Sequence, residues 1–372
     1  MTGQEKQKKQ KQLWLAAPGK IVLREGLPVP EPGPGELLIK IKASLTCGTD
    51  LKAYLRGHNL IPMPGPFGHE FSGVVAAAGR GVKKFRKGDA VMAVHTAPCY
   101  KCPYCEKGLY NLCENIMGSK VLGAFGQYIL LPEHIVAVNT FKKPEALSFE
   151  EAAFLEPLSC VVHGVERVLA AASQRKASSK KSKNTIKKAE GTALIFGAGP
   201  IGLLHLLLLK ARGVRVAMCA LESSRLKLSK RLGAEAVFKP ERLPERFFSG
   251  FAPLGADYVI ECTGRKEVWE SAPRYARRGG VIMLFGGLKE GSPVVFSSSR
   301  IHYDELALVA SFHFCPEDVR RAYRLLAERR VDVSPLISGV CALAGAESAF
   351  KRLAAGKGIK YVIKDAIKSG NK

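Results

Sequence analysis

The feature that most constrains the fold is a glycine-rich hexapeptide, Gly197 to Gly202, between an apolar strand expected at 192–196 and an apolar helix expected at 200–212. In that context a GxGxxG pattern binds the pyrophosphate of a dinucleotide. Gly197 permits the tight turn, Gly199 lets backbone N–H groups approach the phosphates, and Gly202 lets the helix pack closely. Further strands at 215–220, 257–261, 280–285 and 307–311, and a helix at 223–232, predict a parallel, doubly wound sheet. The cofactor contacts expected here are Gly197, Gly199, Pro200, Ile201 and Gly202.

The first part of the chain has a different pattern. Short strands at 36–42, 71–78 and 90–94 are separated by Gly and Pro, which predicts an antiparallel, barrel-like domain. A helical period over 149–169 is interrupted at Glu156-Pro157. Residues 173–191 are rich in Ser, Lys and Ala without periodicity, which indicates a loop. Because 372 residues are too many for one comfortable core, two domains are expected.

Four cysteines in the first part follow a C-x2-C-x2-C-x7-C pattern. Four thiolates at such spacing form a tetrahedral cage that binds one zinc ion and leaves no open position for a substrate. The pattern therefore predicts a structural zinc site. Its ligands are Cys99, Cys102, Cys105 and Cys113.

A second set of metal-type residues is scattered. Cys47 and His69 are suitable zinc ligands, and Glu70 and Glu156 add carboxylates. No histidine follows His69-Glu70 at the spacing of the metalloprotease helix, so that motif is excluded. Spacing alone cannot join residues from such distant segments.

The net charge of +24 is unusual for a chain of this length. Residues 1–12 contribute +3 and residues 173–191 contribute +6, so most of the charge is spread over the body. A solvated basic surface is therefore favoured over a dedicated nucleic-acid groove.

No apolar run is long enough for a membrane span, and the start lacks a secretory apolar core, so the expected location is cytoplasmic. In that compartment the ten cysteines are expected to be metal ligands and core residues.

Taken together, the motifs resemble those of the zinc-dependent medium-chain alcohol and polyol dehydrogenases. The resemblance runs from about residue 13 to residue 364 and is greatest to the sorbitol and threonine dehydrogenase branch, because Glu156 stands where other alcohol dehydrogenases have a second cysteine. The motifs that carry it, in chain order, are Cys47-Gly-Thr-Asp50, Gly68-His69-Glu70-x-x-Gly73-x5-Gly79-x-x-Val82, the cysteine quartet, Glu156-Pro157-Leu158 and Gly197–Gly202.

The resemblance implies a GroES-like β-barrel catalytic domain over 1–160 with a structural zinc lobe at 95–116. It implies an inserted Rossmann domain over 161–303, carrying the basic loop, and a segment 304–372 that ends the Rossmann sheet and returns to the catalytic domain. A homo-oligomer, dimer or tetramer, is expected.

The implied reaction is hydride transfer between NAD(P) and a secondary alcohol, such as a polyol, a sugar derivative or a hydroxy-amino compound. Cys47, His69 and Glu156 would bind a catalytic zinc, with Glu70 as an alternating or neighbouring ligand. Thr49 would hydrogen-bond the substrate oxygen and begin a proton relay.

The chain departs from the family pattern at three places. Lys52 stands where related enzymes usually have a relay histidine. Aligned on Arg225, the ribose-binding aspartate position falls on Ala220, with Glu222 just beyond the expected strand, so NAD and NADP both stay open. The basic segment 173–191 is longer than expected, and is interpreted as an insertion or, less favoured, a tether to an anionic partner.

Two alternative functions stay open at this level. One is a biosynthetic ketone reductase on the same scaffold, running mainly towards the alcohol. The other, less favoured because the ligand set is intact, is a polyanion-binding protein on a retained dehydrogenase scaffold.

Overall fold

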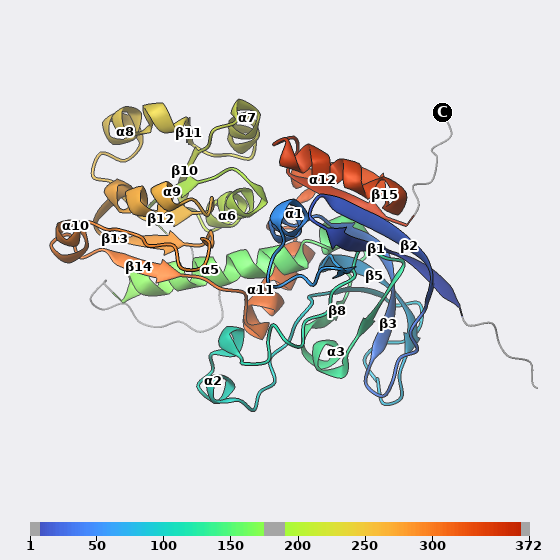
Figure 1. The fold of residues 1–372 in the computed structure, drawn as a ribbon. Coiled ribbons are helices and arrows are strands. Elements are labelled where there is room, and N and C mark those ends of the chain that lie inside the picture. Colours follow the sequence, from blue (N-terminus) through green and yellow to red (C-terminus); the bar gives the residue numbers. More distant parts are fainter. Residues whose placement is uncertain (1–7, 175–189, 366–372) are drawn as a thin grey trace, which may run out of the picture. The chain divides into compact units, whose positions relative to one another are not determined.

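The computed structural model describes residues 8–174 and 190–365, and it confirms the α/β fold class. The chain divides into two compact units, Met1–Ser159 with Cys315–Lys372, and Cys160–Phe314. Most of the basic segment expected as a loop at 173–191 lies outside the described residues. Figure 1 labels helices and strands of both units.

The first unit is built on a seven-stranded sheet, ordered β15-β16-β3-β5-β6-β8, in which β7 also pairs with β3. All its pairs are antiparallel except β15 with β16. A smaller sheet, β2-β1-β4, completes the unit. The strands are β1 (Lys9–Ala17), β2 (Lys20–Pro28), β3 (Leu37–Leu45), β4 (Gly65–Pro66), β5 (Glu70–Ala78), β6 (Ala90–Ala93), β7 (Tyr128–Leu131), β8 (Thr140–Lys142), β15 (Ile337–Ala342) and β16 (Lys360–Lys364).

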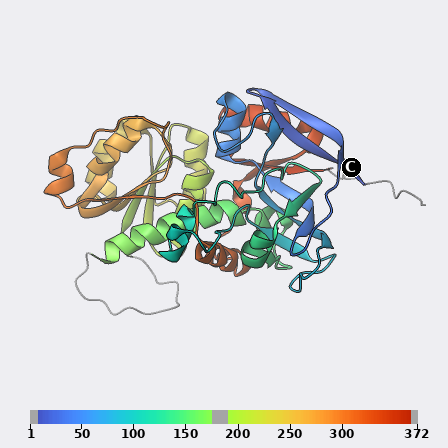
Figure 2. The ribbon, with the colours of Figure 1, turned by 60° about the horizontal axis from the view of Figure 1, so that its bottom comes forward.

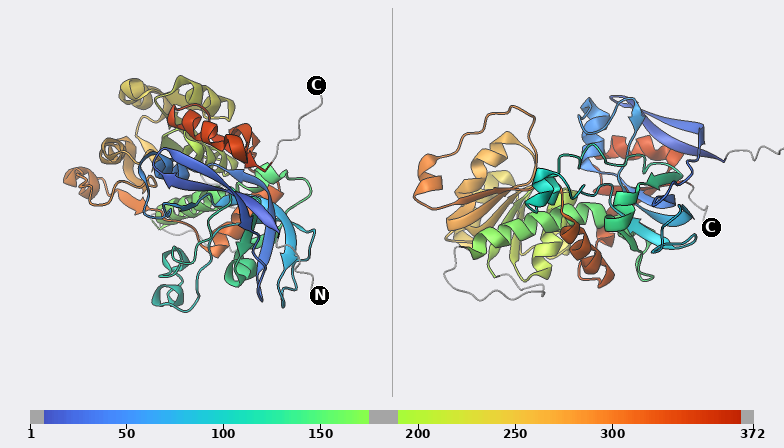
Figure 3. Two further views of the ribbon diagram at one scale, coloured as in Figure 1. Left: turned by 45° about the vertical axis from the view of Figure 1, so that its right-hand side comes forward. Right: turned by 90° about the horizontal axis from the view of Figure 1, so that it is seen from below.

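Several helices accompany the sheets of this unit. Helix α12 packs on the β1–β2 pair through Leu13, Leu15 and Phe350, which share one apolar cluster, and Figure 3 shows the helix beside these strands. The helices are α1 (Gly48–Arg56), α2 (Pro103–Glu106), α3 (Glu133–Asn139), α4 (Phe149–Ala152), α11 (Pro316–Ala327) and α12 (Ala346–Ala354), and α5 (Leu155–Ser173) leads into the second unit.

The second unit is a parallel six-stranded sheet, ordered β11-β10-β9-β12-β13-β14, with helices on both faces (Figure 2). Because both faces are covered, its central strand reads as a continuous apolar run, Ala193 to Phe196, all buried. The strands are β9 (Thr192–Phe196), β10 (Arg215–Cys219), β11 (Ala236–Phe238), β12 (Ala256–Glu261), β13 (Ala276–Leu284) and β14 (Ala307–Ala310). The helices are α6 (Pro200–Ala211), α7 (Ser223–Arg231), α8 (Leu243–Arg246), α9 (Lys266–Ser271) and α10 (Ser298–His302).

One predicted boundary is wrong. The expected break at Glu156-Pro157 falls earlier, between α4 and α5, and Pro157 is the third residue of α5. Proline is tolerated in the first helical turn because the N–H groups there have no partner inside the helix. Glu156 is thereby placed in the first turn of a long helix.

Candidate metal and cofactor sites

Cys47 lies at the start of α1, where the chain leaves β3. It is the N-cap residue: its Sγ accepts a hydrogen bond from the Thr49 N–H at 3.4 Å, and its own N–H donates to Asp50 Oδ2 at 3.1 Å. This capping arrangement fixes both Cys47 and the buried Asp50 at the first turn.

His69 and Glu70 follow a glycine that the packing requires. Gly68 has φ +87°, and a Cβ there would come within 2.6 Å of the Phe125 ring. His69 Nδ1 lies 3.4 Å from Asp50 Oδ1. Burial lowers the pKa of His69, but the charges of Asp50 and Cys47 outweigh it and raise the pKa well above its ordinary value. Negatively charged groups therefore lie next to the imidazole, and the same charges would attract a metal cation.

Glu70 is completely buried beside a buried lysine. Lys360 Nζ donates to Glu70 Oε1 at 2.7 Å and to the Thr46 carbonyl at 2.8 Å. Burial lowers the pKa of Lys360, but the Glu70 carboxylate raises it above the ordinary lysine value. Burial raises the pKa of Glu70 above its ordinary value, and the charge of Lys360 opposes this effect. The hydrogen bonds from Lys360 hold the Glu70 carboxyl group in a fixed orientation.

Glu156 lies beside His95 rather than within the first group. The His95 Nδ1 atom is 3.5 Å from Glu156 Oε1, and the rings of His69 and His95 have centroids 4.9 Å apart. Burial raises the pKa of Glu156 to about 7, an effect that the charge of His69 opposes. Two adjoining groups of donors therefore share one buried region.

The ligand atoms of Cys47, His69 and Glu70 lie within 4.8 Å of one another. One thiol, one imidazole and one carboxylate are donors that suit a zinc ion with an exchangeable position. The structure thus brings together three of the four residues expected at a catalytic zinc, and places the fourth, Glu156, next to His95. Asp50, His95 and Lys360 also lie in this region, and none of them was predicted from the sequence as a site residue.

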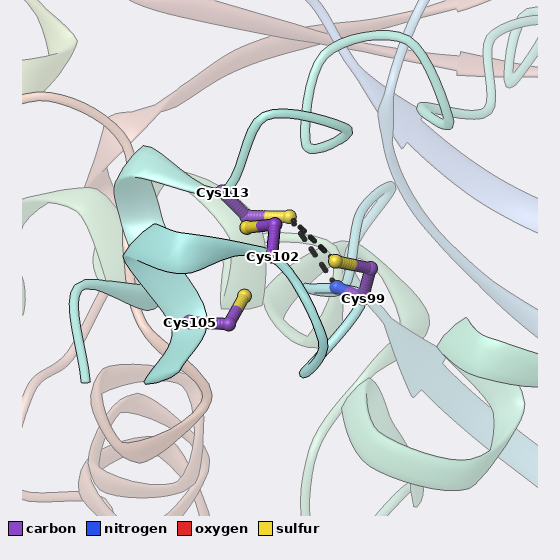
Figure 4. Close-up of side chains that lie close together, drawn as sticks. All are labelled: Cys99, Cys102, Cys105 and Cys113. Atoms are coloured by element: carbon purple, nitrogen blue, oxygen red, sulfur yellow. Dashed lines mark hydrogen bonds between the residues drawn. The ribbon is translucent and has the colours of Figure 1, made fainter. Parts of the chain in front are cut away.

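The cysteine quartet converges as its spacing predicts. The four sulfur atoms lie within 4.8 Å of one another (Figure 4), and the Cys113 thiol donates to Cys99 Sγ at 3.5 Å. A backbone hydrogen bond from Lys101 lowers the pKa of Cys99 to about 6, whereas burial raises the pKa of Cys105 to about 12. Four sulfur donors without another ligand type fit a closed structural zinc site.

The glycine hexapeptide forms the turn from β9 into α6. Gly197 has φ +98°, and a Cβ on Gly202 would come within 1.8 Å of the Gly197 carbonyl oxygen. Gly199 is the N-cap and Pro200 begins the helix, so the first N–H groups of α6 have no side-chain cap. This open cradle at a helix N-terminus fits a dinucleotide pyrophosphate.

The residues expected near the ribose lie at the end of β10. Ala220 directly follows the strand, Glu222 is the exposed N-cap of α7, and Arg225 is half-buried in its first turn. Arg225 Nη1 lies 4.0 Å from the position of a Cβ on Gly199, so its guanidinium group is next to the glycine turn.

No helix in the described part of the chain is both long and apolar enough to span a membrane.

A zinc-type donor group and a sulfur cage on one unit, with a dinucleotide turn on the other, define a zinc-dependent dehydrogenase. Comparison with known proteins agrees. The profile of the alcohol dehydrogenase GroES-like domain matches residues 33–142, and that of the zinc-binding dehydrogenase domain matches residues 200–328.

Relatives match over nearly the whole chain. A probable D-xylulose reductase A of Aspergillus clavatus is 31% identical over 357 residues, which cover 91% of this chain and 92% of the relative. The crystal structure of a putative zinc-binding dehydrogenase from Sinorhizobium meliloti, bound to NADP, has a TM-score of 0.83 at 31% identity, covering 96% of this chain and all of the other. Galactitol-1-phosphate dehydrogenase from Escherichia coli has a TM-score of 0.80 at 27% identity, with 95% and 99% covered.

The chain therefore belongs to the zinc-dependent medium-chain alcohol and polyol dehydrogenase family. It is an oxidoreductase that transfers a hydride between a secondary alcohol and NAD(P), with zinc as the metal. The family membership and the complete donor set do not favour the polyanion-binding alternative.

Proposed function

We propose that the chain oxidises a secondary hydroxyl of a polyol or sugar-derived alcohol reversibly to the ketone. The observation that carries this proposal is the convergence of Cys47, His69 and Glu70 donors within 4.8 Å in a buried site. The names of relatives support the substrate class, since they include D-xylulose reductases and a sugar-alcohol phosphate dehydrogenase.

The zinc would be held by Cys47, His69 and Glu156, with Glu70 as the alternating ligand. Bound there, zinc would lower the pKa of a substrate hydroxyl, and the nicotinamide would exchange the hydride. Asp50 orients the His69 ring, since a carboxylate next to a ligand histidine fixes its tautomer and direction.

The proton of the substrate hydroxyl leaves through α1 in this proposal. Thr49 is half-buried in the first turn and would accept the substrate hydrogen bond. Lys52 is exposed three residues further along, on the same face of the helix, where the proton would pass to solvent. An ordinary lysine is protonated at neutral pH and has no lone pair to accept a proton, unlike the histidine found here in related enzymes, so the proton would pass from Thr49 to solvent water at this end of the helix.

The activity and zinc content of a Cys47 variant, compared with those of a control variant, test the assignment of the catalytic zinc ligands. We expect Cys47→Ser to lose polyol oxidation and one of two zinc ions while keeping the fold. The control Cys341→Ser, at an isolated thiol of β15, should keep its activity and both zinc ions. Full activity in Cys47→Ser would refute the zinc assignment. A screen of polyols, sugars and threonine would test the substrate class, and initial rates in both directions at neutral pH would separate a dehydrogenase from a ketone reductase.

We further propose a homo-oligomer in the cytoplasm. All ten cysteines are free thiols, which suits a reducing compartment. Light scattering at several protein concentrations tests the oligomer, and a mass equal to one chain throughout would refute it.

A further inference from the structure

We infer that Glu261 is a positioning residue for the cofactor. Through its side chain and its carbonyl it holds the loops that follow β12 and β13, and it thereby sets the affinity for the half of the dinucleotide that carries the nicotinamide. The inference rests on the NAD(P) dependence of the family and goes beyond it, because Glu261 belongs neither to the glycine turn nor to the metal donors.

Glu261 ends β12 where the strand order of the parallel sheet reverses. From β9 the chain continues to β10 and β11 on one side, and it returns to β12 on the other side of β9. In doubly wound sheets a dinucleotide binds outside the carboxyl ends of the strands at this point, and the second strand serves the adenosine ribose. The ends of β12 and β13 are therefore left for the nucleotide that carries the nicotinamide.

The side chain of Glu261 is fully buried, and its carboxyl group accepts hydrogen bonds from the loop after β12. Oε1 accepts from the N–H groups of Thr263 at 2.6 Å and Gly264 at 3.1 Å, and from the Thr263 hydroxyl group. Burial raises the pKa of Glu261 above its ordinary value, and the hydrogen bonds from Thr263 and Gly264 oppose this effect. A buried carboxyl group is costly unless such donors surround it, so one side chain fixes the backbone of two consecutive loop residues.

The main chain of Glu261 binds the neighbouring loop, which follows β13. Its carbonyl accepts from the N–H groups of Phe285 and Gly286, both at 3.0 Å. The two loops approach too closely for a side chain between them, since a Cβ on Gly286 would come within 2.3 Å of the Gly264 nitrogen and 2.7 Å of Glu261 Oε2. A change at Glu261 therefore affects both loops.

The loop after β12 also borders the glycine turn. A Cβ on Gly197 would come within 3.0 Å of Thr263 Cγ2. Thr263, Gly264 and Gly286 are only half-buried, so a ligand at the ends of these strands can reach them. Glu261 itself is covered and acts through these residues.

Nucleotide binding measured by calorimetry, without an alcohol substrate, tests the role of Glu261. The probes are the reduced dinucleotide that the wild type binds more tightly, NADH or NADPH, and 5′-AMP, which lacks the nicotinamide half. Glu261→Met removes the acceptor atoms and keeps a side chain of similar length. We expect it to weaken the dinucleotide by at least about tenfold, the factor of one lost hydrogen bond to a charged group, and 5′-AMP by less than about twofold. Equal weakening of both probes, or no weakening, in folded Glu261→Met would overturn the inference.

Asp257→Asn is the matched control, because Asp257 lies near the opposite end of β12 and bonds to the same sheet. It should bind both probes as tightly as the wild type does. A loss of dinucleotide affinity as large as that of Glu261→Met would show that Glu261 only stabilises the sheet, and would overturn the inference.

The conservative variant Glu261→Gln keeps one oxygen acceptor and the shape of the side chain. It should bind the dinucleotide within about threefold of the wild-type affinity, more weakly than the wild type, and leave 5′-AMP unchanged. If Glu261→Met does not fold, this selective loss in Glu261→Gln supports the inference, and wild-type affinity for both probes overturns it.

These outcomes are distinguishable from failure of the proposed substrate, because no alcohol is present. Selective loss of dinucleotide affinity with no polyol oxidised would refute the substrate class and support the role of Glu261. A wild type that binds 5′-AMP but neither dinucleotide would overturn the inference together with the dinucleotide site.

Discussion

At the scale of single residues, Lys360 is the buried charge on which the metal region depends most. It is 1% exposed and pairs with the fully buried Glu70. Removing one partner of a buried ion pair leaves the other without compensation, at a cost of about 3–5 kcal/mol. We therefore expect Lys360→Met to lower the free energy of unfolding by about that amount, measured by urea denaturation.

A matched control lies four residues further along β16. Lys364 pairs with the partly exposed Glu150, and Lys364→Met should cost at most about 1 kcal/mol. The double variant Glu70→Gln/Lys360→Met should recover part of the loss, because no unpaired charge remains. Equal costs for the two lysines would show that Lys360 and Glu70 are not held as a buried ion pair.

The sequence predicts Cys47, His69 and Glu70 but not Lys360, for a physical reason. Cysteine and histidine in a recognisable motif indicate metal chemistry, whereas a lysine ordinarily lies on the surface. Lys360 is buried because β16 pairs with β3, with Val362 opposite Leu45, a contact across more than 300 residues. His95 was not predicted for the same reason, since only the folded chain places it next to Glu156.

At the scale of elements, one carboxylate joins the ends of three strands in the parallel sheet. Asp257 in β12 accepts hydrogen bonds from the Thr192 N–H of β9 at 2.7 Å and from Arg277 Nε of β13 at 2.7 Å. Burial raises the pKa of Asp257, but the Thr192 and Arg277 hydrogen bonds outweigh it and lower the pKa below its ordinary value of 3.8.

A group whose pKa is lowered by folding stabilises the fold above its unfolded pKa, and that stabilisation is lost as the pH falls through the folded pKa. We therefore expect Asp257→Asn to be less stable than the wild type by about 1.5–3 kcal/mol at pH 7, with the difference shrinking below about pH 4. Urea denaturation from pH 7 to pH 3 measures this. A difference that is constant over the range would contradict the ionic role of Asp257.

The zinc lobe has only a small apolar core of its own. Its cluster consists of the four cysteines with Ile116, Tyr110 and Met117. Because so few apolar groups pack there, bound metal should supply most of the folding free energy. We expect Cys105→Ser to lower zinc content from two ions to one and to abolish hydrogen-exchange protection over 99–116. Cys341→Ser should change neither, and a lobe that kept its protection without zinc would contradict this role.

Elements with a strong local pattern were predictable, and the others were not. The expected strands at 192–196 and 257–261 match β9 and β12 within one residue, because continuous apolar runs between turn residues are characteristic of buried parallel strands. The three-residue β11 was missed, since a segment so short carries no periodicity. The start of α5 was misplaced because Pro157 was interpreted as a break rather than as a first-turn residue.

At the scale of the whole molecule, each predicted ligand site and each of the two apolar clusters named below belongs to one of the two units. Both predicted metal sites belong to the unit containing Met1–Ser159, and the dinucleotide turn belongs to Cys160–Phe314. The apolar clusters around Phe247 and around Phe350 each draw their members from one unit only. Each ligand should therefore stabilise the unit that binds it.

We expect calorimetric unfolding to show two transitions that respond to different ligands. NADPH at 100 times its dissociation constant adds about 2.7 kcal/mol to the unit that binds it, which raises its Tm by about 5–10 °C for about 155 residues. A zinc chelator should lower the other transition and leave the first in place, since a chelator removes only metal-linked stability. A single transition that NADPH raises and the chelator lowers would show instead that the two units unfold as one cooperative structure.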